Sequence, residues 1–130
     1  MRTVVVVNGE IGDQAPARAL AAAADLLICA DGGTRHVRAW GLRPHAVVGD
    51  FDSTDAGYIA ALAAAGAELV RYPKHKDETD LELALEYALA AGSRDIVILG
   101  AIGGRVDHAL ANIMLLTWER LAGVDVAIVD

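Results

Sequence analysis

Two acidic residues separated by one position are the strongest candidates for chemistry in this chain of 130 residues. Asp50 and Asp52 lie in residues 49–53, with the sequence GDFDS, directly after the apolar pair Val47-Val48. Because residues i and i+2 of an extended chain point to the same side, we expect both carboxylates to face one point. Their repulsion would cost about 4 kcal/mol at roughly 4 Å with an effective dielectric near 20. A divalent cation, or protonation of one acid, would remove that cost; a simple polar turn is the alternative.

A third acid, Asp80, lies at the expected start of a helix. The stretch from Thr79 to Glu82 fits a capping box with Thr79 as the N-cap, and an acid in the first turn favours the helix dipole. These local roles would explain Asp80 without any ligand. If it lies near Asp50 and Asp52, however, three hard oxygen donors share one place, which is typical of a Mg²⁺ site that also binds a phosphate. We therefore interpret Asp50, Asp52 and Asp80 as candidate metal ligands.

A glycine-rich turn opens the last expected helix at residues 103–108, with the sequence GGRVDH. Glycines let the backbone approach a phosphate, the start of a helix offers free N–H groups, and Arg105 could bind phosphate oxygens in bidentate fashion. Asp107 is either part of such a site or a simple N-cap. The sequence contains neither G-x-x-x-x-G-K-[ST] nor G-x-G-x-x-G, which disfavours a P-loop enzyme and an ordinary dinucleotide-binding domain.

Apolar, β-branched runs alternate with alanine- and leucine-rich segments along the chain. This alternation predicts an α/β fold, a Rossmann-like three-layer domain with a mainly parallel sheet of about six strands. Ligands of such sheets gather beyond the carboxyl ends of the strands, so the loops that follow strands should form the site. We expect strands at 3–7, 26–30, 45–48, 68–72, 96–99 and 124–129, and helices at 16–24, 34–40, 55–65, 81–92 and a last one that includes Leu110 and Leu121.

Composition excludes several classes of protein. The formal net charge is −7 and the basic residues form no patch, which argues against a nucleic-acid partner. Cys29 is the only cysteine and lies in an apolar run, which predicts a buried, inert thiol and no internal disulfide. The longest apolar stretch, residues 20–30, contains Asp25 and is too short to span a bilayer. With no signal-peptide pattern at its start, the chain is predicted to be cytoplasmic, without a membrane partner.

Four blocks in series give the chain a resemblance to a known family. They are ADGG at 30–33, GDFDS at 49–53, KDETD at 76–80 and GGRVDH at 103–108, with Asn112 beyond. Each block is weak alone, but together and in this order they resemble the catalytic domain of thiamine pyrophosphokinase. The resemblance implies transfer of the terminal pyrophosphoryl group of ATP to the hydroxyl of thiamine, which gives thiamine diphosphate and AMP.

The resemblance also implies roles for particular residues. Three acids would hold Mg²⁺, and either Asp107 or Asp80 could accept the proton of the hydroxyl. The family forms homodimers with thiamine near the subunit boundary, so a homodimer is expected. The expected metal ligands are Asp50, Asp52 and Asp80, and the residues expected to line the nucleotide and pyrophosphate are Asp31, Gly32, Gly33, Thr79, Gly103, Gly104, Arg105 and Asp107.

The resemblance leaves the acceptor open. The family carries a second, β-rich domain that contributes to the thiamine pocket, whereas residues 1–130 correspond to the catalytic domain alone. Another hydroxymethyl compound, such as a pterin alcohol, could then be the acceptor, or the chain could be a non-catalytic nucleotide-binding module. A phosphatase with an aspartyl nucleophile in a D-x-D-x-[TV] loop is a weaker alternative, because that loop follows the first strand of its fold and residues 50–54 follow the third expected strand.

Overall fold

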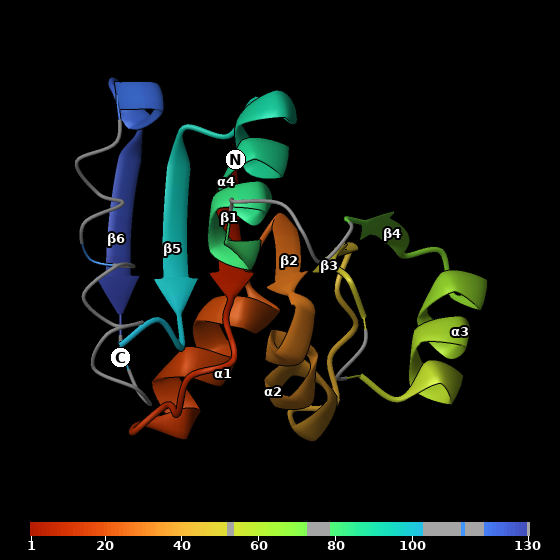
Figure 1. The fold of residues 1–130 in the computed structure, drawn as a ribbon. Coiled ribbons are helices and arrows are strands. Elements are labelled where there is room, and N and C mark those ends of the chain that lie inside the picture. The colour runs from red at the N-terminus through yellow and green to blue at the C-terminus, as the bar shows by residue number, and fades with distance from the viewer. Residues whose placement is uncertain (52–53, 73–78, 103–112, 114–118, 130) are drawn as a thin grey trace.

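The computed structural model describes residues 1–51, 54–72, 79–102, 113 and 119–129, and these residues build one six-stranded sheet (Figure 1). The strand order is β4-β3-β2-β1-β5-β6, and every neighbouring pair is parallel. The predicted α/β fold is therefore confirmed, with a sheet that is parallel throughout. The strands are β1 (Arg2–Val6), β2 (Leu26–Ala30), β3 (Ala46–Gly49), β4 (Glu68–Arg71), β5 (Asp95–Leu99) and β6 (Asp125–Val129).

Helices connect the successive strands from β1 to β5, as parallel pairing requires. Where the structure describes an expected element, its bounds shift by no more than about two residues. The last expected helix falls mostly outside the described residues. The helical elements are α1 (Gln14–Ala22), the 3-10 turn η1 (Asp31–Gly33), α2 (Thr34–Ala39), α3 (Ala56–Ala64), α4 (Asp80–Ala90) and the 3-10 turn η3 (Glu119–Leu121).

Successive strand residues point to opposite faces of the sheet, and this divides the core into two clusters. On one face, Val6, Cys29 and Val47 pack among buried residues of α1, α2 and α3. On the other face, Val5 and Ile28 pack among the buried residues of α4. Helix α4 buries positions 81, 84, 85 and 88, the spacing of one helical face. The result is the expected three-layer domain.

The order in which strands are added to the sheet changes direction at β1. It runs from β1 through β2 and β3 to β4, and α4 then returns it to β5 on the other side of β1. Beyond the strand ends, Val7 N donates to Leu99 O at 2.7 Å and Gly9 N donates to Gly100 O at 2.8 Å. Ligands of open parallel sheets bind at the carboxyl edge near such a switch point, which is the edge where the arrowheads of Figure 1 end.

Two predictions from composition can be compared with the structure. Cys29 is fully buried, and burial raises the pKa of its thiol well above the usual range, so the thiol is inert as expected. In the described part of the chain, none of the helices has the length and apolar character needed to cross a bilayer.

Candidate active site

The turn after β2 contains the DGG sequence and packs directly against the end of β1. A Cβ atom at Gly33 would lie 2.7 Å from the carbonyl carbon of Val6 and closer still to its oxygen. A Cβ at Gly32 would lie 2.6 Å from Cγ of Asn8. Close approach of two main-chain segments therefore requires glycine at position 33, whereas a Cβ at Gly32 would meet only the side chain of Asn8. The turn brings Asp31 to the edge of the sheet.

Asp31 lies against the end of the neighbouring strand β3. It has a φ of 36°, which is uncommon for a residue with a side chain, and it is buried. Its Oδ1 accepts a hydrogen bond of 3.0 Å from Oγ1 of Thr54. A Cβ at Gly49, whose φ is 151°, would lie 2.8 Å from Cβ of Asp31. The DGG turn and the start of the GDFDS stretch are therefore in direct contact.

The expectation that the chain is extended from Asp50 to Asp52 is wrong at Phe51. Phe51 has a φ of 67°, in the left-handed region, and its ring joins the core cluster on the α1–α3 side of the sheet. With this backbone conformation, the Phe51 side chain is buried in that cluster. Asp52 and Ser53 lie outside the described residues, so the common direction of Asp50 and Asp52 stays a prediction.

The start of α4 brings another acid to the same edge. Thr79 is the N-cap, and its Oγ1 accepts a hydrogen bond of 3.2 Å from the backbone N–H of Glu82, which confirms the predicted cap. Asp80 is the first residue of the helix. Burial, followed by the negative charges of Asp31 and Asp50, raises the pKa of its carboxyl from 3.8 to about 6. The ends of β2 and β3 and the start of α4 therefore place three interacting acids together.

The described residues do not form a complete metal site by themselves. Among them, no three histidine, cysteine or acidic side chains are arranged to hold one ion. Of the predicted metal ligands, Asp50 and Asp80 are described and repel one another, whereas Asp52 is not described. Of the predicted nucleotide-binding residues, Asp31, Gly32, Gly33 and Thr79 lie at this edge, whereas Gly103, Gly104, Arg105 and Asp107 lie outside the described residues.

The raised pKa of Asp80 predicts how stability depends on pH in the absence of metal. Between pH values of about 4 and 6 the folded state keeps a proton that the unfolded state releases, so Asp80 makes the protein less stable as pH rises through this window. The penalty is absent below the window and complete above it. Asp80→Asn removes the charge, so the melting temperature of the variant minus that of the wild type should rise with pH across the window.

Scanning calorimetry in EDTA at several pH values measures that difference directly. A difference that stays constant, or falls, as pH rises from about 4 to 7 would show that Asp80 is not in an environment that opposes its charge.

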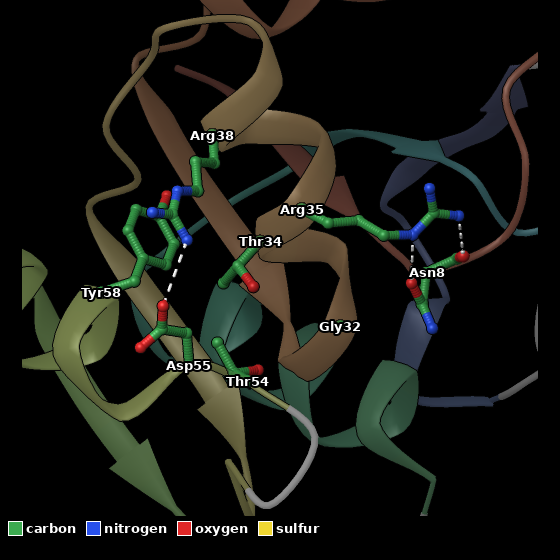
Figure 2. A pocket seen from close by; sticks show the side chains of 8 residues that line it. All are labelled: Asn8, Gly32, Thr34, Arg35, Arg38, Thr54, Asp55 and Tyr58. Atoms are coloured by element: carbon green, nitrogen blue, oxygen red, sulfur yellow. Dashed lines mark hydrogen bonds and ion pairs between the residues drawn. The ribbon is translucent and has the colours of Figure 1, made fainter.

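A pocket of about 280 Å³ lies between α2 and α3 (Figure 2). Arg35 donates from Nε to Oδ1 of Asn8 at 2.7 Å and from Nη2 to the Asn8 carbonyl at 2.8 Å. Arg38 stacks over the ring of Tyr58 with its Cζ 4.5 Å from the centroid. The pocket is lined by Asn8, Gly32, Thr34, Arg35, Arg38, Thr54, Asp55 and Tyr58.

The two arginines of this pocket were not predicted from the sequence. Arg35 and Arg38 are spaced i, i+3 on a short helix, which places them on one face, and that spacing was the available signal. Arg38 also pairs with Asp55, at 3.6 Å between Nη1 and Oδ2. Thr54 both lines the pocket and donates a hydrogen bond to Asp31. The pocket that Arg35 and Arg38 line therefore adjoins Asp31.

The loop after β1 forms one wall of this region and is fixed by α2. His36 Nε2 donates to the carbonyl of Gly9 at 2.6 Å, and burial lowers the pKa of the imidazole. Trp40 Nε1 donates to Oε1 of Gln14 at 2.8 Å. These bonds, with those of Arg35 to Asn8, hold the loop against α2 and the start of α1.

Comparison with known proteins identifies the family. Residues 17–128 match a family model described as "Thiamin pyrophosphokinase, catalytic domain". The chain belongs to the thiamine pyrophosphokinase family. It is 37% identical over 105 residues to thiamine pyrophosphokinase of Bacillus subtilis, and this match covers 81% of the chain. It is 31% identical over 134 residues to thiamine pyrophosphokinase 1 of Oryza sativa subsp. japonica, and this match covers 87% of the chain.

The fold agrees with solved structures of the thiamine pyrophosphokinase family. The crystal structure of a thiamin pyrophosphokinase family protein from Enterococcus faecalis superimposes with a TM-score of 0.84 at 32% identity, covering 100% of this chain and 62% of that one. The chain spans about half the length of the curated relatives, 49% of the bacterial protein and 50% of the plant protein. The predicted family is thereby confirmed for the catalytic domain.

Proposed function

We propose that this chain carries the catalytic part of a thiamine pyrophosphokinase, which transfers the pyrophosphoryl group of ATP to the hydroxyl of thiamine and releases AMP. One observation carries the proposal: at the carboxyl edge of the sheet, burial and then the negative charges of Asp31 and Asp50 raise the pKa of Asp80 to about 6. Membership in the family supports the reaction class and the acceptor.

The donor set at this edge fits Mg²⁺. Carboxylate oxygens are the ligands that this ion prefers. Burial, followed by the charges of Asp31 and Asp50, raises the pKa of Asp80, and a divalent cation would favour its ionised form. Asp50, Asp52 and Asp80 would hold the ion. When bound, Mg²⁺ would neutralise charge on the phosphates and help to orient them for in-line displacement.

The residues of the chain itself would bind and orient the nucleotide. The DGG turn would face the triphosphate at the carboxyl edge of the sheet, where Gly33 allows the turn to pack against the end of β1. The pocket beside Asp31 would receive an adjoining part of ATP, since the guanidinium groups of Arg35 and Arg38 are suited to phosphate oxygens.

Replacement of Arg35 by methionine tests the role of this pocket. Loss of the guanidinium should raise the KM for ATP about tenfold, the effect of about 1.4 kcal/mol of lost binding, and leave the KM for thiamine within about twofold. Steady-state kinetics with each substrate varied in turn measure both constants. Arg43→Met, at an exposed arginine beyond α2, is the matched control. Equal KM values for ATP in the two variants would remove Arg35 from the nucleotide site.

Transfer also requires a group that accepts the proton of the thiamine hydroxyl. Asp80 and Asp107 are the two candidates. The raised pKa of Asp80 supports a role as the proton acceptor, because a carboxylate with such a pKa can take up a proton near neutral pH. Coordination of Mg²⁺ would lower that pKa again, so the two proposed roles of Asp80 exclude one another. If Asp80 is a ligand, Asp107 would be the base.

The experiment that tests the proposal is an assay of AMP release. The chain is incubated with ATP, Mg²⁺ and thiamine, and in parallel with a hydroxymethyl pterin or with no acceptor. AMP and thiamine diphosphate in equal amounts support the proposal. AMP formed only with the pterin moves the acceptor to another alcohol. ATP and Mg²⁺ binding without AMP from any acceptor would instead support a non-catalytic nucleotide-binding module.

The assembly state belongs to the same proposal. We expect a homodimer, on the basis of the family resemblance, and light scattering coupled to gel filtration measures it. A cytoplasmic location and the lack of a nucleic-acid partner stay predictions from the composition of the chain.

A further inference from the structure

Arg71 contacts the turn that carries Asp50, although it belongs to a different strand. It is the last residue of β4 and is paired in register with Gly49 at the end of β3. Its Nη1 donates to the main-chain carbonyl of Asp50 at 3.0 Å. Its Cζ lies 4.9 Å from the centroid of the Phe51 ring, within the range of a cation–π contact. One guanidinium therefore touches two consecutive residues of the GDFDS stretch.

The contacted turn has an unfavourable backbone conformation that must be held in place. Phe51 has a φ of 67°, a region that bulky L-residues rarely adopt. Such conformations persist where the surrounding structure over-determines them, and they concentrate at functional sites. Core packing restrains the buried ring of Phe51 from within, and the exposed Arg71 restrains the same residue and the carbonyl before it from the solvent side.

We propose that Arg71 is a positioning residue that fixes the Asp50–Phe51 turn and so sets the direction of the Asp50 carboxylate toward Asp80. The role of this direction rests on the proposed function, in which Asp50 and Asp80 share a divalent cation. Arg71 acts through the carbonyl of Asp50 and the ring of Phe51. Its effect should therefore appear in metal affinity, as it does for residues that orient metal ligands elsewhere.

The chemistry of the contact explains why arginine is needed. A planar guanidinium can lie over an aromatic ring and at the same time donate a hydrogen bond from its edge, whereas an ammonium group has no such plane. Lysine at position 71 should therefore restore the charge and only part of the positioning. Methionine keeps the length of the side chain and removes both interactions.

The test compares Arg71→Met and Arg71→Lys with Arg2→Met. Arg2 is a matched control, because it is an exposed arginine with an ion pair to Asp95 at the opposite end of the strands. Electron paramagnetic resonance of free Mn²⁺ measures metal affinity without any turnover. Crystal structures of wild type and Arg71→Met report φ of residue 51 whether or not metal binds.

We expect Arg71→Met to weaken Mn²⁺ binding by roughly tenfold or more, Arg71→Lys to have an intermediate effect, and Arg2→Met to stay within about twofold of wild type. We also expect Phe51 to leave the left-handed region in the methionine variant. Unchanged φ at Phe51 overturns the inference, and so does wild-type Mn²⁺ affinity in a variant that has only a lower melting temperature. If the wild-type protein binds no Mn²⁺, the proposed function fails, and φ of Phe51 still decides the role of Arg71.

Discussion

Asp80→Asn is expected to lower the rate of AMP formation from ATP and thiamine by roughly a hundredfold or more. A metal ion contributes several kcal/mol of charge stabilisation in phosphoryl transfer, and each 1.36 kcal/mol corresponds to about tenfold in rate. Asparagine preserves the size of the side chain but removes a negative ligand from the edge where Asp31 and Asp50 lie. The same loss is expected for Asp52→Ala. Initial rates at saturating ATP and thiamine measure the effect.

A matched control for Asp80→Asn exists in the same helical turn. Glu82 is another acid in the first turn of α4, and its charge is not among the causes of the raised pKa of Asp80. Glu82→Gln should keep the rate within about twofold of wild type, since it perturbs only the surroundings of the cap. Loss of activity in Asp80→Asn cannot arise from unfolding if calorimetry shows that this variant melts no lower than the wild type at neutral pH. Activity above about a tenth of wild type would contradict the metal assignment.

Gly33→Ala is expected to destabilise the fold by about 3 kcal/mol or more, at the upper end of overpacking effects. Gly33 has a φ of −60°, which alanine adopts readily, so backbone conformation costs nothing here. The penalty comes from the new Cβ, which would lie 2.7 Å from the carbonyl carbon of Val6 on the central strand β1. Relief would require the DGG turn to move away from the sheet edge. Urea unfolding of wild type and variant measures the difference in the free energy of unfolding.

Gly41→Ala separates close approach from backbone strain. Gly41 has a φ of 72°, and a Cβ placed there meets nothing within 4 Å. Alanine at this position should cost only about 1–2 kcal/mol, the price of the left-handed conformation. If Gly33→Ala cost no more than Gly41→Ala, the tight packing between the DGG turn and β1 would not be a constraint on the fold.

The sequence contained enough local information to predict the architecture and the edge of the candidate site. The continuous β-branched run at residues 3–7 predicted a buried parallel strand, and the structure has β1 at Arg2–Val6. Strand–helix alternation then required the loops after β2 and β3 to share an edge, and Asp31 does lie against Gly49. The N-cap at Thr79 was also local, because one hydroxyl and a backbone N–H three residues later define it.

The remaining features depend on residues that are distant in the sequence. The hydrogen bond from Arg71 to Asp50 spans 21 positions and that from Arg35 to Asn8 spans 27, so no local pattern indicates either. Phe51 was predicted to lie in an extended segment, because the sequence gives no sign that its ring is buried in the core. Asp31 was expected only to line the nucleotide. In the structure the DGG turn also places Asp31 near Asp80, so its negative charge contributes to the raised pKa of Asp80.

The central claim is that the carboxylates of Asp50, Asp52 and Asp80 share one divalent cation at the carboxyl edge of the sheet. A crystal structure with Mn²⁺ and a non-hydrolysable ATP analogue, with the ion located by its anomalous scattering, tests it most directly. The account predicts one ion ligated by oxygens of all three aspartates and of the triphosphate. An ion bound elsewhere, or three carboxylates too far apart to contact one ion, would contradict it.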